Sequence, residues 1–301
     1  MIIKGGIFME LREYRYFLAV AREESITKAS EFLHISQPGL SKVIMNIEEE
    51  LGKKLFVREN RKITLTDDGI LLRKRAQEIV DLADKTEAEF TSVDNDISGE
   101  VFIGGGETEG MRIIAKTIKE LNNNYPNIHY NLFSGNAQDV TEKLDKGLLD
   151  FGILIEPVDV TKYEYIHLPF SDTWGLLMRK DNALSKKDCI EPNDLLNIPL
   201  ICSRQVFMEN ELSNWIGSDF NKLNIISTYN LIFNAALMVD EGVGCAITLD
   251  KLVNTGEDSD LCFRPLKNSK KSSLILVWKK YQVFSKSSQK FLDELKNQIK
   301  I

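Results

Sequence analysis

The sequence predicts an α+β N-terminal winged helix-turn-helix domain over residues 9–66, a long helix over residues 67–94, and a two-lobed α/β domain over residues 95–301. Three observations support this fold class. In the first part, three segments have apolar residues at helical spacing, and two short segments of alternating apolar and polar residues follow. In the second part, apolar residues have heptad-like spacing, and in the third part predicted strands alternate with predicted helices. With 301 residues the chain is long enough for two or three domains of about 150 residues each.

The composition is that of an ordinary globular protein, with 43% hydrophobic and 28% charged residues. The net charge of -7 argues against a protein that coats nucleic acid without sequence preference, so any DNA contact must be local. No apolar run approaches the roughly 18 residues of a membrane span, and the first eight residues lack the features of a secretory signal. We therefore expect a cytoplasmic protein that binds no membrane, and we expect residues 1–8, before Met9, to be a dispensable leader or a misassigned start.

The cysteines and histidines show no metal-binding spacing. The four cysteines are far apart, without a C-x-x-C pair: Cys189, Cys202, Cys245 and Cys262. We expect buried free thiols rather than a redox switch, and neither a metal nor another cofactor. No nucleophile with a base and no metal-ligand set stands out, so we predict no catalytic residue.

Two helices are predicted at the start of the first domain. Between Leu11 and Ala21, apolar residues recur with the i, i+3, i+4, i+7 spacing of a helix with one buried face. Ser25 or Thr27 can cap a second helix of about two turns, which ends near His34.

A third helix follows and exposes a polar face. Ser36 caps it, Pro38 is tolerated in its first turn because the missing amide hydrogen would have no partner there, and Gly52 ends it. Its buried stripe is formed by Leu40, Val43, Ile44, Ile47 and Leu51. The opposite face presents Gln37, Pro38, Ser41, Lys42, Met45 and Asn46. Gln, Ser and Lys pair with base edges or phosphates, which favours a helix-turn-helix on DNA over a three-helix packing module.

Residues 53–65 predict a wing, because two short alternating strands flank a turn at Glu59–Arg61. Basic residues outnumber acidic ones here, although the chain is acidic overall: Lys53, Lys54, Arg58, Arg61 and Lys62 are opposed only by Glu59. This concentration of positive charge predicts binding to double-stranded DNA rather than a merely solvated face.

These segments resemble the N-terminal domain of LysR-type transcriptional regulators over residues 9 to about 93. The resemblance rests on the runs Phe17–Ser30, Leu33–Lys42, Ile47–Gly52, Leu55–Arg58 and Leu65–Gly69. It implies a winged helix-turn-helix repressor or activator with DNA contacts at Thr27, Gln37, Pro38, Ser41, Lys42 and Arg58. Arg61, the other arginine of the wing, is added to this set for its charge. Gly39 departs from the family, which more often has Ala there, and we expect it to loosen the helix slightly.

Residues 67–94 predict a long dimerisation helix of roughly 40 Å. Thr66 caps it, and apolar residues alternate spacings of four and three as along a heptad seam: Leu72, Ala76, Ile79, Ala83, Thr86, Phe90 and Val93. We expect this helix to pack on a second copy rather than to be one surface helix of a globular domain. A dimer would read two half-sites, so the operator is expected to be partly palindromic. The resemblance implies tetramers built as pairs of dimers.

The last two-thirds of the chain predict two α/β lobes. Strands alternate with helices to residue 155 in a pattern typical of a parallel sheet, a second set follows from residue 173 to 248, and a last strand and helix return to the first lobe. We expect crossings between the lobes near Ile166 and Pro265. Lobe I then covers about 95–166 and 268–301, and lobe II about 167–267.

The run Leu144–Ile153 also resembles the effector domain of LysR-type regulators, which implies a type 2 periplasmic-binding-protein-like fold. We expect a small-molecule effector in the cleft between the lobes, since the carboxyl ends of the strands meet there. By the resemblance, the effector contacts are Thr108, Ser134, Asn136, Ser203 and Asn230. Arg204 is interpreted as a clamp for an effector carboxylate, or alternatively as a surface arginine paired with Glu209.

Glu107 and Glu109 lie in the loop that follows the first strand of lobe I and is expected to line the cleft. The glycines of this loop superficially resemble those of a dinucleotide-binding loop. Two acids would repel a pyrophosphate, so we expect no nucleotide there. We interpret both glutamates as groups that set ligand polarity rather than as an acid/base pair.

The sequence thus predicts a ligand-responsive DNA-binding transcriptional regulator that binds its operator as an oligomer and is not an enzyme. The alternative is a small-molecule-binding or hinged-cleft enzyme domain with an accessory DNA-binding module.

Overall fold

The structure is a computed structural model, and it describes residues 9–59, 62–91, 97–204, 211–269 and 271–300. The chain divides into two units, Met1–Thr91 and Ser92–Ile301. Within the described residues, no helix is both long and apolar enough to cross a membrane, and no group of His, Cys, Asp or Glu side chains is arranged to hold a metal ion.

Three helices form the core of the first unit: α1 Leu11–Glu23, α2 Ile26–Phe32 and α3 Gln37–Leu51. They enclose a cluster that includes the fully buried Phe17, Val20 and Leu40. Of the two predicted caps for α2, Ser25 is the cap, because its side chain accepts the amide of Lys28 at 3.3 Å. Ser36 caps α3 in the same way through the amide of Gly39.

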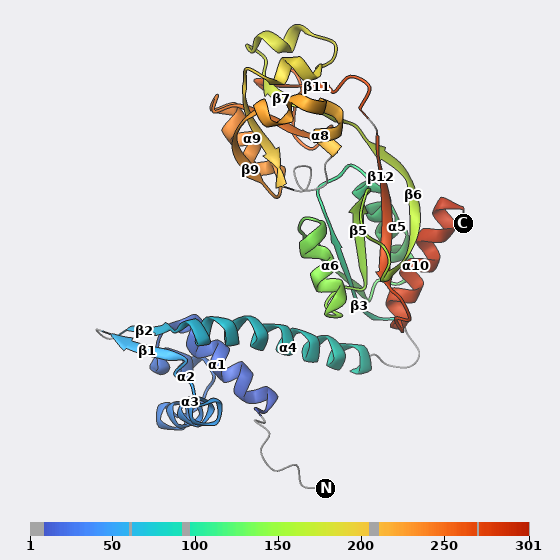
Figure 1. Ribbon diagram of the computed structural model, residues 1–301. Coiled ribbons are helices and arrows are strands. Elements are labelled where there is room, and N and C mark those ends of the chain that lie inside the picture. The colour runs from blue at the N-terminus through green and yellow to red at the C-terminus, as the bar shows by residue number, and fades with distance from the viewer. Residues whose placement is uncertain (1–8, 60–61, 92–96, 205–210, 270, 301) are drawn as a thin grey trace. The chain divides into compact units, whose positions relative to one another are not determined.

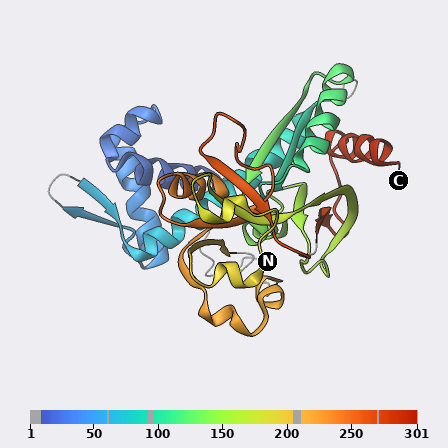
Figure 2. The same ribbon diagram turned by 90° about the horizontal axis from the view of Figure 1, so that it is seen from above.

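A two-stranded wing follows these helices, as predicted. Strands β1 Phe56–Glu59 and β2 Lys62–Leu65 pair antiparallel, with Phe56 opposite Leu65. Figure 2 shows the two strands side by side at the edge of the helical group.

Helix α4, Asp67–Thr91, begins after Thr66, whose hydroxyl accepts the amide of Gly69 at 3.0 Å. It packs along α1, and Ala76 is fully buried in the core of the first unit, with Leu72 packed against the same cluster. The predicted seam is therefore wrong at these two positions, because an apolar stripe of helical period does not tell which neighbour covers it. The large apolar side chains that α4 leaves exposed are Ile70, Leu71, Ile79 and Leu82. The side chains of Phe90 and Val93 lie outside the described residues.

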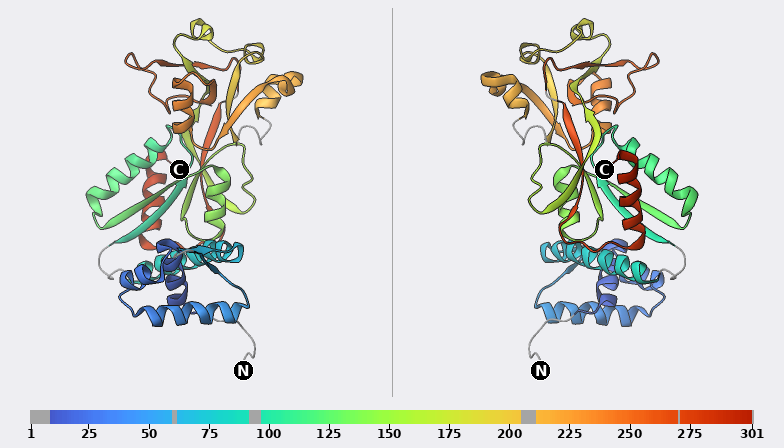
Figure 3. Two further views of the ribbon diagram at one scale, coloured as in Figure 1. Left: turned by 90° about the vertical axis from the view of Figure 1, so that its left-hand side faces the viewer. Right: turned by 90° about the vertical axis from the view of Figure 1, so that its right-hand side faces the viewer.

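Lobe I of the second unit is a five-stranded sheet in the order β4-β3-β5-β12-β6. Its strands are β3 Gly99–Gly105, β4 Ile128–Ser134, β5 Phe151–Ile155, β6 Tyr163–Asp172 and β12 Ser272–Lys279. The expected parallel sheet is in fact mixed, because β12 runs antiparallel to both β5 and β6. Helices α5 Met111–Asn124 and α10 Lys286–Ile299 cover one face, and α6 Ala137–Asp145 covers the other (Figures 1 and 3).

Lobe II has a second five-stranded sheet in the order β11-β7-β10-β8-β9. Its strands are β7 Trp174–Arg179, β8 Pro199–Ser203, β9 Asn224–Tyr229, β10 Cys245–Leu249 and β11 Leu261–Pro265. Among its described residues, the helices are α8 Glu211–Ile216 and α9 Ile232–Asp240, with short 3-10 turns at Ala183–Lys186, Pro192–Leu195 and Gly217–Lys222. Separate apolar clusters fill its two faces.

The first crossing between the lobes lies at Thr173, not near Ile166. Strand β6 pairs with β12 as far as Asp172, so lobe I extends to that residue and the predicted boundary is corrected. Pro169 lies within β6, which is an edge strand with an irregularity in its register at this point, where a missing amide hydrogen is tolerated.

The cysteines are free thiols, of which Cys202, Cys245 and Cys262 are buried and Cys189 is half-buried. Burial raises the pKa of Cys202 to about 12 and that of Cys245 to about 11. These thiols therefore stay protonated and unreactive at neutral pH.

Candidate functional sites

Helix α3 exposes a polar face opposite an apolar stripe, of which Leu40, Ile44 and Ile47 are buried and Val43 and Leu51 half-buried. Leu40, Ile44 and Ile47 point into the core, whereas the residues predicted on the other side, Gln37, Pro38, Lys42, Met45 and Asn46, are exposed and Ser41 is half-buried. Thr27, in the first turn of α2, is also exposed. Five of the seven predicted nucleic-acid contacts therefore lie at the surface of the first unit: Thr27, Gln37, Pro38, Ser41 and Lys42.

The two wing arginines are placed only in part. The backbone of Arg58 lies in β1 opposite Ile63, and its side chain lies outside the described residues. Arg61 lies outside the described residues altogether.

Glu48 fixes the wing to the C-terminal half of α3. Its buried carboxylate accepts the backbone amides of Leu55 at 2.9 Å and Phe56 at 3.2 Å, and the ammonium of Lys54 lies 2.6 Å away. Burial by itself would raise the pKa of Glu48, but these hydrogen bonds and the charge of Lys54 outweigh it and lower the pKa. Sequence reasoning missed this residue, although Glu48 follows Ile44 by four residues and so lies on the buried stripe.

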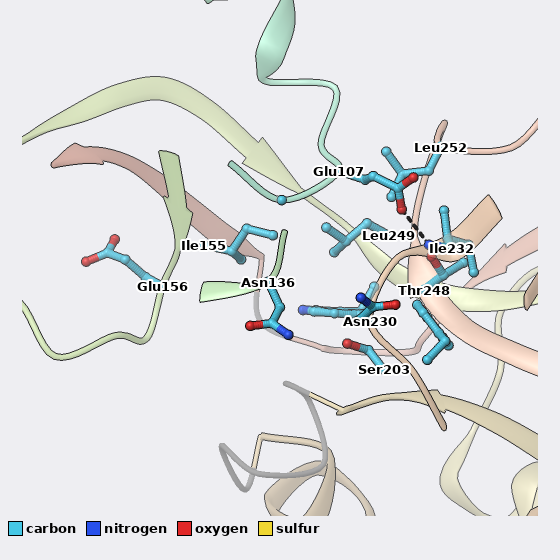
Figure 4. A pocket seen from close by; sticks show the side chains of 13 residues that line it. Glu107, Asn136, Ile155, Glu156, Ser203, Asn230, Ile232, Thr248, Leu249 and Leu252 are labelled. Carbon is cyan, nitrogen blue, oxygen red and sulfur yellow. Dashed lines mark hydrogen bonds between the residues drawn. The ribbon is translucent and has the colours of Figure 1, made fainter. Parts of the chain in front are cut away.

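A pocket of about 50 Å³ lies between the lobes of the second unit. It is lined by Gly106, Glu107, Asn136, Ile155, Glu156, Trp174, Ser203, Tyr229, Asn230, Ile232, Thr248, Leu249 and Leu252. Asn136, Ser203 and Asn230 lie close together on one side, and the carboxylate of Glu107 points at Ile232 (Figure 4). The sequence predicted three of these contacts but none of the residues from β10, although Thr248 and Leu249 stand at the carboxyl end of a predicted strand.

The two asparagines of the pocket are oriented by their own backbone surroundings. The side-chain oxygen of Asn136 accepts the amide of Asp139 at 3.0 Å and so caps α6. The side-chain oxygen of Asn230 accepts the amide of Leu231 at 2.9 Å. Since both oxygens bind backbone amides, the amide NH₂ groups are the parts that can serve a ligand.

Glu107 joins the two lobes. Its carboxylate, from the loop after β3, accepts the backbone amide of Ile232, the first residue of α9. The N-cap residue of α9 is Leu231, whose side chain cannot accept a hydrogen bond, so Glu107 takes over the capping of this helix from the opposite lobe.

Thr108 and Ser134 do not line the inter-lobe pocket. Thr108 is buried and donates to a carboxylate oxygen of Asp172 at 2.5 Å, at the end of β6. Burial raises the pKa of Asp172, and the nearby charges of Glu109 and Asp250 raise it further. Thr108 and Ser134 line a second cavity of about 300 Å³ instead, together with Glu107, Glu109, Met111, Leu132, Phe133, Lys251 and Leu252, among others.

Arg204, the predicted carboxylate clamp, is exposed and lines neither of these two cavities. The six predicted effector contacts therefore divide into three at the inter-lobe pocket, two at the second cavity and Arg204 at neither.

Family models match both parts of the chain. Residues 94–300 match the LysR substrate binding domain, and residues 11–70 match the bacterial regulatory helix-turn-helix protein, lysR family. Among curated proteins, the Hca operon transcriptional activator HcaR of Escherichia coli is 26% identical, covering 90% of this chain and 92% of that protein. The HTH-type transcriptional regulator BsdA of Bacillus subtilis is 27% identical, covering 72% and 74%.

Among solved structures, full-length CbnR in complex with its target DNA has the same fold, with a TM-score of 0.73 and 17% identity over 96% of this chain and 99% of that one. The predicted fold class, a winged helix-turn-helix followed by a two-lobed α/β domain, is thereby confirmed, and so is the predicted class of function. The chain belongs to the LysR family of transcriptional regulators, with a DNA-binding helix-turn-helix and a substrate-binding domain.

Proposed function

We propose that this regulator binds a partly palindromic operator as an oligomer and that a small effector in the inter-lobe pocket changes how it binds that operator. The exposed polar face of α3, opposite the stripe that packs into the core, is the observation that carries the proposal. The regulator acts in the cytoplasm, by binding rather than by catalysis.

On the DNA, Gln37, Ser41 and Lys42 read base edges in the major groove, since they lie in the first turns of α3, which is the part of a recognition helix that enters the groove. Pro38 packs against the backbone or a thymine methyl. Thr27, Arg58 and Arg61 contact phosphates and set the register of the helix on the duplex.

Dimerisation uses the outer face of α4. Leu71, Ile79 and Leu82 are exposed on α4, although the same helix packs on α1 and buries Ala76. Three apolar side chains at these spacings on one helix favour a second copy as the partner, and a dimer doubles the operator half-sites. Pairs of dimers would give the tetramer.

The effector contacts Asn136, Ser203 and Asn230, which lie at or just after the ends of three different strands and on one side of the inter-lobe pocket. An effector that bound only one arrangement of the two lobes would shift the protein toward that arrangement. Thr108 and Ser134 would touch only a ligand that reaches the second cavity, and Arg204 only one that reaches beyond the pocket.

Footprinting on the DNA flanking the protein's own gene tests the proposal. We expect two protected half-sites about one helical turn, or a multiple of it, apart, with a pattern that changes when the effector is added. Protection that is uniform along the fragment, or that competitor DNA of random sequence removes equally well, would contradict it.

A further inference from the structure

The inter-lobe pocket is acidic. Glu107 and Glu156 are among its lining residues, and no lysine, arginine or histidine is, within the part of the chain that the structure describes. Residues 205–210, next to Arg204 in the chain, contain Glu209 and no basic residue, so this segment cannot supply a cation either. The charged side chains that line this pocket are therefore acidic, whereas Lys251 lines the second cavity, which shares Glu107 with it.

The feature of the pocket that would attract an anion is already occupied. The N-terminus of α9 carries the positive end of a helix dipole, where a ligand carboxylate would ordinarily bind. Here the carboxylate of Glu107 accepts the amide of Ile232 at that position (Figure 4). An anionic ligand would have to displace Glu107 and would still lie beside its charge.

The polar groups of the two aromatic residues in the pocket already donate hydrogen bonds within the protein. The Tyr229 hydroxyl donates to the carbonyl of Ile247 at 2.7 Å, and the Trp174 indole N–H donates to the hydroxyl of Ser272 at 2.7 Å. Their rings thus offer apolar and π surface, to which a cation is attracted.

Three neutral polar side chains of the pocket, those of Asn136, Ser203 and Asn230, lie close together (Figure 4). Asn136 and Asn230 can offer NH₂ donors there, and Ser203 a hydroxyl (Figure 4). These groups suit an oxygen acceptor on the ligand. The side chain of Glu156 extends away from this group and lies 3.5 Å from the imidazole of His167.

We propose that the effector of this regulator is a small protonated amine with a neutral oxygen acceptor, its ammonium paired with Glu107 and its oxygen bound by Asn136 and Asn230. This inference rests on the proposed function, of which it specifies the ligand. A charge-assisted hydrogen bond to Glu107 stabilises the amine, whereas a simple carboxylate would lose its water beside a like charge without a cation to replace it. A pocket of about 50 Å³ has room for an ammonium group together with a few further atoms.

Two matched probes test the proposal on the full-length protein: 4-amino-1-butanol, a cation, and 4-hydroxybutyrate, an anion of the same length with the same terminal hydroxyl. Each is titrated calorimetrically in the millimolar range at one ionic strength. We expect the amine to bind more tightly, and Glu107→Gln to weaken the amine by on the order of tenfold, the usual effect of losing a hydrogen bond to a charged group.

Glu164→Gln is the matched control, since Glu164 is exposed on β6 and lines neither cavity. It removes the same charge from the same unit and should leave both affinities unchanged. Glu107→Asp keeps the charge and should retain the preference for the amine, which guards against an effect of Glu107→Gln on folding.

Equal binding of the two probes, binding of neither, or an amine affinity that Glu107→Gln leaves unchanged would overturn the proposal. So would tighter binding of 4-hydroxybutyrate than of the amine by the wild-type protein, because Glu107 would then only hold the place of an anionic ligand. In that last case the proposed function would survive, since an effector would still bind the pocket. The proposed function fails separately, if no ligand of the pocket alters the footprint on DNA.

Discussion

The exposed face of α3 and the inter-lobe pocket are assembled in opposite ways. The face comes from one run of sequence, Gln37–Leu51, and needs only the period of a helix. The pocket is assembled from strand ends and loops of both lobes, and the hydrogen bond between Glu107 and Ile232 spans 125 residues of sequence. Local sequence patterns therefore predict the first site residue by residue, whereas long-range packing determines the second.

The two units should respond separately to damage in their cores, and the largest effect is expected from Leu40→Ala. Leu40 is fully buried in the first unit, so the cavity should lower the free energy of unfolding of that unit by about 2 to 5 kcal/mol. All three tryptophans, Trp174, Trp215 and Trp278, lie in the second unit. Helical circular dichroism in urea should therefore shift, while tryptophan fluorescence should not. Met45→Ala, at an exposed position of the same helix, is the control.

Glu48→Gln should separate the wing from α3 at a cost of about 1 to 3 kcal/mol, because two backbone amides and Lys54 lose a charged acceptor. The pKa of Glu48 is lowered in the folded state, so its contribution is present above the pKa of the unfolded chain and is lost as the pH falls through the folded pKa. The stability difference between wild type and variant should thus vanish in acid. The exposed Glu49→Gln should show no such pH dependence.

Lys42→Ala should weaken binding to the operator by roughly 1 to 3 kcal/mol and leave binding to random DNA nearly unchanged, if Lys42 reads a base. Arg58→Ala should weaken both and lower the salt dependence by about one unit of slope, as expected for a phosphate contact. Gel-shift titrations over a salt series measure both quantities. Equal losses on operator and random DNA in the lysine variant would place Lys42 on a phosphate.

Glu107→Ala should give the smallest effect, a loss of about 0.5 to 2 kcal/mol in the second unit, since α9 loses its cap. Tryptophan fluorescence in urea reports this unit alone. An unchanged urea midpoint would mean that the hydrogen bond between Glu107 and Ile232 contributes nothing to the stability of the second unit. The long-range contact would then not stabilise the site that it helps to assemble.

Prediction from the sequence succeeded where an interaction spans few residues. The caps at Ser25 and Ser36, the exposed face of α3 and the antiparallel wing follow from spacings of three and four residues or from strand alternation. It went wrong at Leu72 and Ala76, whose stripe α1 covers, and at Asp172, where an edge strand with a proline was not recognised. At Leu72 and Ala76 the apolar stripe was recognised correctly, but the helix that covers it, α1, lies elsewhere in the chain.

The candidate pocket shows the same limit. Asn136, Ser203 and Asn230 follow strands or open helices, which placed them near the cleft, but Thr108 turned toward Asp172. The residue types and helical periods of this chain were enough to specify a winged helix-turn-helix with a polar reading face, because those features depend on neighbours within one or two turns. Only the tertiary structure decided that Glu107 caps α9 from the opposite lobe, because hydrogen bonds between distant loops depend on how both sheets pack and leave no periodic trace in the sequence.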